Sequence, residues 1–176
     1  MTFPWGERIW LVGPSGAGKS TFARALQARL QVPLIELDRM FWLPDWRRAD
    51  VSTFESAVLT AAAADRWIID GQYDIAHHLL RERADMVIWL DTAAGTVFPR
   101  LVRRTVRRLT TREELWNGNR ERLLGALQLL GWSAREFRRV RVCNEHLLNF
   151  LQERQTCCLR VRTREDLRTL LAALET

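Results

Sequence analysis

The sequence contains almost no lysine. Of its 176 residues 27 are basic, and 26 of these are arginines. The single lysine, Lys19, lies in the stretch GPSGAGKS. A guanine-specific GTPase of the common type recognises its base with an Asn-Lys-x-Asp motif, and the chain has no second lysine to form one. The scarcity of lysine therefore excludes this kind of guanine recognition.

Cysteine is also scarce. The three cysteines are Cys143, Cys157 and Cys158, two of which are adjacent in the sequence. An odd number with this spacing fits neither a disulfide framework nor a zinc site. We expect reduced and mostly buried thiols.

Long apolar runs are missing as well. No stretch approaches the roughly 20 apolar residues of a membrane helix, and no basic and then apolar signal region precedes the first expected strand. We find no internal repeat, low-complexity tract or linker. With 47% hydrophobic and 27% charged residues, the composition is typical of one globular domain over residues 1–176. These features predict a cytoplasmic protein with no membrane partner, either a monomer or a homodimer.

Short apolar runs alternate with longer amphipathic segments, which is typical of an α/β fold with a parallel sheet. Strands are expected at residues 9–12, 34–37, 67–69, 86–90 and 157–161. Helices are expected at residues 19–31, 50–64, 74–83, 96–110, 120–130, 134–154 and 164–174. The stretch 92–155 is too long for one crossover helix, so we expect additional helical structure there.

Residues 13–20 match the pattern G-x-x-x-x-G-K-[ST] between an expected strand and an expected helix. Such a loop points backbone N–H groups at phosphate oxygens, and the following helix adds the positive end of its dipole. Lys19 would contact the β- and γ-phosphates of ATP as a compact ammonium, for which a planar guanidinium is too broad. Ser20 would supply a hydroxyl for Mg²⁺. The expected nucleotide-binding residues of this loop are Gly13, Ser15, Gly16, Ala17, Gly18, Lys19, Ser20 and Thr21.

Two carboxylates end apolar strands, Asp70 in WIID and Asp91 in VIWLD. Either could hold the Mg²⁺ ion with its water shell. Gly71 lets the backbone turn tightly beside a ligand, which favours Asp70. The alternative for Asp91 is a cap on the helix that follows.

Asp38 closes the second expected strand, and Arg39 follows it. A carboxylate here could orient an acceptor hydroxyl and accept its proton, while the arginine could hold an acceptor phosphate. The alternative is a helix N-cap with a solvated arginine beside it. Phe41, Trp42 and Trp46 could line an acceptor pocket or belong to the core.

The basic residues gather in one segment. Between Arg100 and Arg141 there are 12 arginines against 4 acids, a local charge of +8, whereas the whole chain carries +6. The arginines at 100, 103, 104, 107 and 108 share one helical face. Because like charges repel and no acid lies at i±4, we expect an anionic partner for this face.

Three interpretations of this face remain open. A closing lid could bring Arg104 and Arg108 to the phosphoryl group in transfer. The face could instead be solvated, or it could contact nucleic acid. Residues 114–122 could form the tip of the lid, where Asn119 and Arg120 would meet a substrate.

In their order along the chain, these motifs resemble those of small P-loop kinases of the adenylate kinase type. The resemblance is closest to the bacterial group labelled DNA topology modulation proteins or adenylate kinase-related kinases. It implies the P-loop NTPase fold, with a five-stranded parallel sheet in the order 2-3-1-4-5, ATP with Mg²⁺, and a helical lid, here at about residues 96–133.

The segment IIDGQY is similar to the DGFPR segment of adenylate kinases, which supports Asp70 as the magnesium residue. Gln72 and Tyr73 replace Phe-Pro-Arg, so an arginine that would hold a nucleoside monophosphate is missing. The same resemblance implies that Arg162 lies near the adenine. The candidate acceptor-binding residues are Asp38, Arg39, Trp42, Asp70, Gly71 and Tyr73.

The sequence thus predicts a Mg²⁺-dependent phosphotransferase that moves the γ-phosphoryl group of ATP to a small molecule or a nucleotide. Lys19, Asp38, Arg104 and Arg108 are the expected catalytic residues, and Arg104 and Arg162 are further expected contacts to the nucleotide. One alternative is a nucleotide-binding regulator that contacts DNA through the basic segment, although no known DNA-reading module is recognisable. Another is an ATPase without a specific acceptor.

Overall fold

The structure, a computed structural model, describes residues 6–173. Five strands form one parallel sheet in the order β2-β5-β1-β6-β7. Their bounds are β1 Arg8–Val12, β2 Leu34–Glu36, β5 Trp67–Asp70, β6 Met86–Leu90 and β7 Cys157–Val161. This confirms the expected α/β fold, the five expected strands and the order 2-3-1-4-5.

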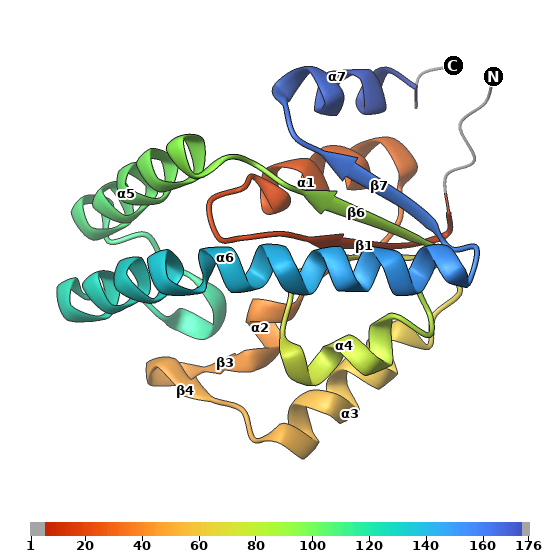
Figure 1. The fold of residues 1–176 in the computed structure, drawn as a ribbon. Coiled ribbons are helices and arrows are strands. Elements are labelled where there is room, and N and C mark those ends of the chain that lie inside the picture. The colour runs from red at the N-terminus through yellow and green to blue at the C-terminus, as the bar shows by residue number, and fades with distance from the viewer. Residues whose placement is uncertain (1–5, 174–176) are drawn as a thin grey trace.

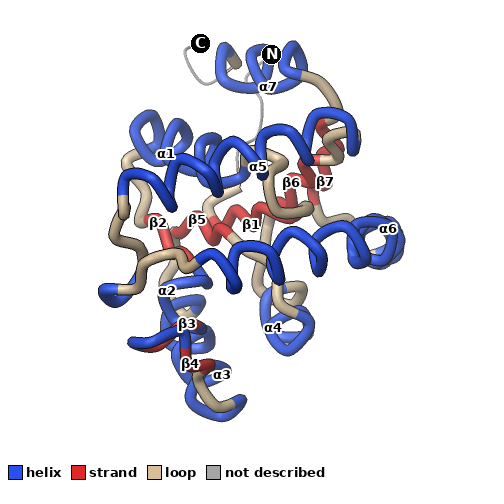
Figure 2. The backbone as a smooth tube through the Cα atoms, turned by 90° about the vertical axis from the view of Figure 1, so that its left-hand side faces the viewer, coloured by secondary structure: helices blue, strands red, loops and turns tan. Residues whose placement is uncertain are grey.

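Helices cover both faces of the sheet (Figure 2). One face carries α1 (Lys19–Leu30) and α7 (Arg164–Ala172), and the other carries α3 (Val51–Ala62), α4 (Asp74–Leu80) and α6 (Leu123–Glu153). Thr163 and Asp166 begin α7 with a reciprocal capping box, and the Asp50 side chain caps α3 through the Thr53 amide. Such caps satisfy amide groups that the helix itself leaves unpaired.

The core lies on both sides of the sheet because successive strand side chains point to opposite faces. Trp10, Trp67 and Trp89 pack against α3, α4 and α6 and are fully buried. Ile9 and Ile68 are fully buried on the α1 side. Burying one such side chain contributes about 1.5–3 kcal/mol, so the sheet is a rigid base for the loops at its carboxyl ends.

The prediction of two helices at 120–130 and 134–154 is wrong, because α6 is one helix of 31 residues. Gly131 inside it costs only about 0.5–1 kcal/mol relative to alanine. Packing overrides that cost, since Ser133 and Phe137 are buried and the rings of Phe137 and Phe98 lie 5.5 Å apart. Phe98 belongs to α5 (Ala94–Thr111), the helix beside it.

A helical arm extends beyond the carboxyl ends of the strands (Figure 1). It comprises residues 94–133: α5, the connection with the 3₁₀ turn η2 (Trp116–Gly118), and the first third of α6. Among the described residues, no helix has the length and the apolar composition needed to cross a membrane.

A second feature at this end of the sheet was not foreseen from the sequence. Residues 37–48, which we call the hairpin segment, contain α2 (Leu37–Phe41), β3 (Trp42–Leu43), the 3₁₀ turn η1 (Pro44–Trp46) and β4 (Arg47–Arg48). β3 and β4 pair antiparallel. Elements this short carry too little periodicity to be recognised in a sequence.

Candidate functional site

The loop between β1 and α1 encloses the side chain of its own lysine. Lys19 Nζ donates hydrogen bonds to the carbonyl oxygens of Gly13 at 2.7 Å and Pro14 at 3.1 Å. Gly13, Gly16 and Gly18 have φ angles of 138°, 86° and 103°, which residues with a Cβ rarely adopt. A Cβ at Gly13 would also lie 2.6 Å from the Leu90 carbonyl oxygen. The glycines therefore permit the curled backbone that a phosphate cradle requires.

Other predicted members of the loop differ in exposure. Ala17 is buried, and its carbonyl accepts a hydrogen bond from Thr92 Oγ1 at 3.2 Å. Ser15 and Ser20 are half-buried, and Thr21 is exposed on α1.

Asp70 ends β5 beside the lysine and is only 7% exposed. Burial raises the pKa of Asp70, while the Lys19 charge and a hydrogen bond from Ser20 oppose the shift. Burial lowers the pKa of Lys19, and the charges of Asp70 and Asp38 oppose that shift. The structure thus brings an ammonium, two carboxylates and a serine hydroxyl together at the mouth of the loop.

Asp91, the other magnesium candidate, has different surroundings. Its carboxylate accepts from Arg160 at 2.7 Å and pairs with Arg141 Nε at 2.8 Å and Arg162 Nε at 3.8 Å. The cap interpretation of Asp91 is wrong, since Ala93 is the N-cap residue of α5 and no side chain caps that helix.

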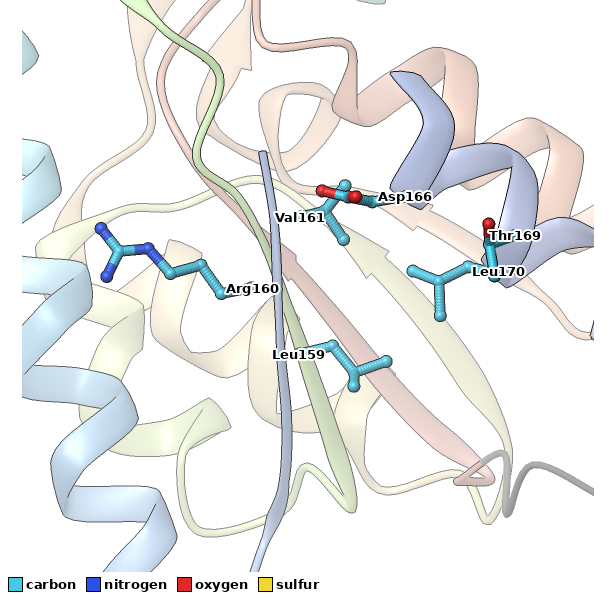
Figure 3. Close-up of a pocket in the computed structure, with 6 residues that line it drawn as sticks. All are labelled: Leu159, Arg160, Val161, Asp166, Thr169 and Leu170. Atoms are coloured by element: carbon cyan, nitrogen blue, oxygen red, sulfur yellow. The ribbon is translucent and has the colours of Figure 1, made fainter. Parts of the chain in front are cut away.

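A pocket of about 260 Å³ lies between β7 and α7 (Figure 3). Leu159 and Val161 project toward α7, whereas Arg160 extends to the other side of β7. Asp166 in the pocket wall accepts hydrogen bonds from the amides of Arg162 and Thr163. The Arg162 side chain is exposed. The position of Arg162 near an adenine stays a prediction.

Asp38 lies close to Tyr73 on the acceptor side of the loop. The Tyr73 hydroxyl donates a hydrogen bond to Asp38 Oδ1 at 2.5 Å. Burial and the Asp38 charge both raise the pKa of Tyr73. Asp38 is in the first turn of α2, whose N-cap residue is Glu36. The N-cap interpretation of Asp38 is therefore wrong.

The aromatic residues of the hairpin segment pack on one another and, through Phe41, on Phe54 and Tyr73. Trp42 lies edge-on to Phe41 at 5.1 Å and to Trp46 at 5.5 Å. The Arg48 guanidinium lies 5.9 Å from the centre of the Trp42 ring. Arg39, expected to hold an acceptor phosphate, has an exposed side chain.

The arginine face of α5 divides into two edges. Arg100, Arg104 and Arg108 are half-buried along the inner edge, and Arg103 and Arg107 are exposed along the outer one. The five arginines therefore differ in exposure, and the anionic partner expected for this face stays a prediction.

The connection after α5 supplies acids for part of this face. Arg107 pairs with Glu113 at 2.8 Å, and Arg108 pairs with Glu121 at 3.2 Å. Burial and the Arg108 charge lower the pKa of Arg104. Arg104 Nε is buried and has no hydrogen-bond partner among the described residues.

The tip of the arm is docked on the hairpin segment. Trp116 Nε1 donates to Glu36 Oε2 at 3.0 Å, and Asn117 Nδ2 donates to the Trp42 carbonyl at 2.6 Å. Trp46 Nε1 in turn donates to the Arg120 carbonyl at 2.9 Å. The arm and the hairpin segment therefore close over the same end of the sheet.

Asn119 is central to this contact. It is 4% exposed, its Oδ1 accepts from the Trp46 amide at 2.8 Å, and its Nδ2 donates to the Leu43 carbonyl at 2.9 Å. The expectation that Asn119 meets a substrate is wrong in this arrangement, because both ends of its amide are occupied by the backbone of the hairpin segment.

Sequence reasoning missed a polar link below the loop. Gly13 N donates to Gln72 Oε1 at 3.1 Å, and Gln72 Nε2 donates to Asn144 Oδ1 at 2.7 Å. Asn144 is fully buried on α6. The sequence contained a signal for this link. Asn144 is spaced from Phe137 and Leu148 so that all three lie on one face of the helix, and a polar residue on an apolar face is expected to have a hydrogen-bond partner.

A family model described as an AAA domain matches residues 9–168 of this chain. The chain belongs to the AAA domain family. No curated protein matches the sequence.

Solved structures with the fold of this AAA domain protein include two shikimate kinases. The enzyme from Acinetobacter baumannii in complex with shikimate is 17% identical with a TM-score of 0.54, and covers 97% of this chain and 91% of its own. The enzyme from Bacteroides thetaiotaomicron is 16% identical with a TM-score of 0.57, and covers 96% of each chain. At this level of identity the likeness is one of fold alone. Family and fold together support a P-loop kinase or nucleoside triphosphatase.

Proposed function

We propose that this AAA domain protein is a Mg²⁺-dependent kinase that transfers the γ-phosphoryl group of ATP to a small acceptor. One observation carries the proposal: the half-buried Lys19 ammonium is held inside the loop by the Gly13 and Pro14 carbonyls, and the charges of Asp70, Asp38 and Arg104 all act on it. Charged residues that lie together with shifted pKa values, here Lys19, Asp70 and Arg104, are typical of catalytic sites. An isolated nucleotide-binding loop would need neither Asp38 nor Arg104.

In the proposed site, the backbone of residues 13–21 and Lys19 bind the phosphates of ATP. Arg104 faces the γ-phosphoryl group, which its buried and unpartnered Nε fits. Arg108, the second expected catalytic arginine, pairs with Glu121 on the inner edge of α5, and we propose that it reaches the phosphoryl group beside Arg104. Arg162 contributes from the turn after β7, near the adenine.

Ser20 and Asp70 would hold Mg²⁺. The donor set fits this cation, which prefers oxygen ligands, and burial leaves the Asp70 carboxylate with a raised pKa that a divalent cation would lower. When bound, the ion neutralises charge that develops on the phosphate oxygens.

Asp38 would orient the acceptor hydroxyl, and Trp42 and Gly71 would border the acceptor. Arg39, at the exposed edge, would meet an anionic end of the acceptor.

We also propose that residues 94–133 act as the lid of a single domain of residues 1–176, in keeping with the resemblance to adenylate kinase-related kinases. The half-buried positions of Arg104 and Arg108 favour this role for these two residues over DNA contact, since duplex contacts need exposed cations.

A screen of acceptors tests the proposal. Release of ADP from MgATP is measured with nucleoside monophosphates and small hydroxyl metabolites, against the rate without acceptor, and Lys19→Ala serves as the inactive control. We expect at least one acceptor to stimulate the wild type and none to stimulate Lys19→Ala. Wild-type protein that no acceptor stimulates, yet that binds duplex DNA at micromolar concentration and physiological salt, would support the regulator instead.

A further inference from the structure

We propose that Tyr73 is a positioning residue whose hydroxyl holds the Asp38 carboxylate in the orientation that an acceptor hydroxyl requires. The inference rests on the proposed kinase function and assigns Tyr73 a different role from the substrate contact that the sequence predicts. Its basis is the 2.5 Å hydrogen bond from Tyr73 to Asp38 Oδ1.

The Tyr73 ring is itself held in place. Its centre lies 4.4 Å from that of Phe41 and 5.3 Å from that of Phe54. Tyr73 is also the residue just before α4, at the end of the turn that follows Asp70. A ring fixed by aromatic packing on α2 and α3 gives its hydroxyl a fixed direction, which a surface hydroxyl would lack.

Asp38 needs such restraint because two cations are near. Its charge acts on both Lys19 and Arg104, yet among the described residues it forms an ion pair with neither. A carboxylate free to rotate would be drawn toward one of them and would compete with the phosphates for it. The hydrogen bond from Tyr73 keeps Asp38 on the acceptor side and leaves Oδ2 for the acceptor hydroxyl.

The chemistry of phosphoryl transfer suits this arrangement. The transition state is loose in most analyses, so positioning contributes more than the strength of the base. A neutral phenol donates a hydrogen bond without adding charge beside the γ-phosphate. The phenol therefore fixes the carboxylate, and the positive charges of the site remain available to the phosphates of the nucleotide.

The first test observes the hydrogen bond without any turnover. Tyr73 is the only tyrosine of the chain, so protein labelled with ¹³C at the tyrosine Cζ gives one resonance, whose shift reports hydrogen bonding of the hydroxyl. We expect Asp38→Asn to shift this resonance and Glu36→Gln, a neighbouring carboxylate change, to leave it in place. A resonance that is unmoved by Asp38→Asn would overturn the inference.

The second test separates positioning from packing. With the acceptor found in the screen, Tyr73→Phe should lower kcat about tenfold, the value of one hydrogen bond to a charged group, and should leave the KM for ATP unchanged. Val58→Ala removes buried packing from α3 and keeps both rings that hold Tyr73, so it should lower the melting temperature and preserve kcat.

A double-mutant cycle completes the test. In the Asp38→Asn background, Tyr73→Phe should cause no further loss of kcat, because the hydroxyl acts only through Asp38. An equal loss in both backgrounds would overturn the inference. If no acceptor stimulates the enzyme, the proposed function fails by itself, whereas the resonance of Tyr73 still decides whether the hydroxyl holds Asp38.

Discussion

Asp70 and Asp91 look alike in the sequence and have opposite surroundings in the fold. Each ends or follows a buried strand next to β1, and each is buried, at 7% and 4% exposure. Asp91 is surrounded by Arg141, Arg160 and Arg162. Asp70 has one ammonium and one hydroxyl beside it, and burial still raises its pKa.

The difference indicates where a ligand belongs. The negative charge of a buried carboxylate that pairs with several arginines is neutralised within the protein, and such a carboxylate contributes to the fold. The charge of a buried carboxylate with too few cationic partners is neutralised only when a cation binds. The arrangement at Asp70 costs stability in the ligand-free protein. Such a cost is typical of residues retained for function.

The largest expected effect is on turnover. Asp70→Asn should lower kcat by about 10²-fold or more, because the amide binds Mg²⁺ weakly. Asp91→Asn should leave kcat per folded molecule within about twofold of the wild type, since that carboxylate lies outside the proposed site. Acceptor-stimulated ADP release measures both variants. Equal losses in the two variants would remove the distinction between the two carboxylates.

The next effect concerns stability. Asp91→Asn should lower the free energy of unfolding by about 2 kcal/mol, less than the loss of a fully buried pair because the arginines are partly exposed. Urea denaturation measures the change. Glu145→Gln is the matched control, since Glu145 contacts Arg160 at 3.1 Å from an exposed position and should contribute below about 1 kcal/mol. If Asp91→Asn had the same urea denaturation midpoint as the wild type, the stabilising role of Asp91 would be contradicted.

Exchanging the type of cation sharpens the comparison. Lys19→Arg keeps the charge but should lower turnover at least about tenfold, because a guanidinium does not fit inside the loop. Arg160→Lys makes the reverse change at Asp91, where Arg160 also lies 4.1 Å from the Trp89 ring centre. Arg160→Lys should lower the free energy of unfolding and leave turnover unchanged. Near-normal turnover by Lys19→Arg would refute the argument from loop geometry.

The smallest effect is on the pH dependence of stability. Because the folded-state pKa of Asp70 is raised above its ordinary value of 3.8, its contribution to stability is present at low pH and is lost as the pH rises through the folded-state pKa. Without Mg²⁺ and nucleotide, Asp70→Asn should match the wild type near pH 3.5 and melt about 2–4 °C higher at neutral pH. Melting curves between these pH values measure the difference in melting temperature between the variant and the wild type. If this difference became smaller as the pH rises, the prediction would be contradicted.

The sheet was predictable because its information is local. Runs such as 86–90 and 157–161 are mostly apolar, so each can be recognised from a few consecutive residues, and the pattern of the Gly13–Ser20 loop is complete in eight consecutive residues. The single helix α6 was not predictable, because Gly131 is a typical helix breaker in a sequence, whereas the burial of Ser133 and Phe137 and the contact of Phe137 with Phe98 depend on the fold.

The site was predictable where a single residue at or just after the end of a strand suggests a role by itself. Lys19, Asp38 and Asp70 were named from the sequence and lie within reach of one another. The hydrogen bond between Asp38 and Tyr73 joins residues 35 positions apart, and the contact between Asn119 and Trp46 spans 73. Neither pairing is encoded in any local pattern, so neither could be read before the fold was known.

The continuous helix α6 has a mechanical consequence. At about 1.5 Å per residue it is about 46 Å long, with the arm at one end and Asn144 farther along, where Gln72 links it to Gly13. The arm and the residue that links to the Gly13 loop therefore lie on one continuous helix, so a rigid-body shift of the arm would also bear on the contact between Gln72 and Gly13.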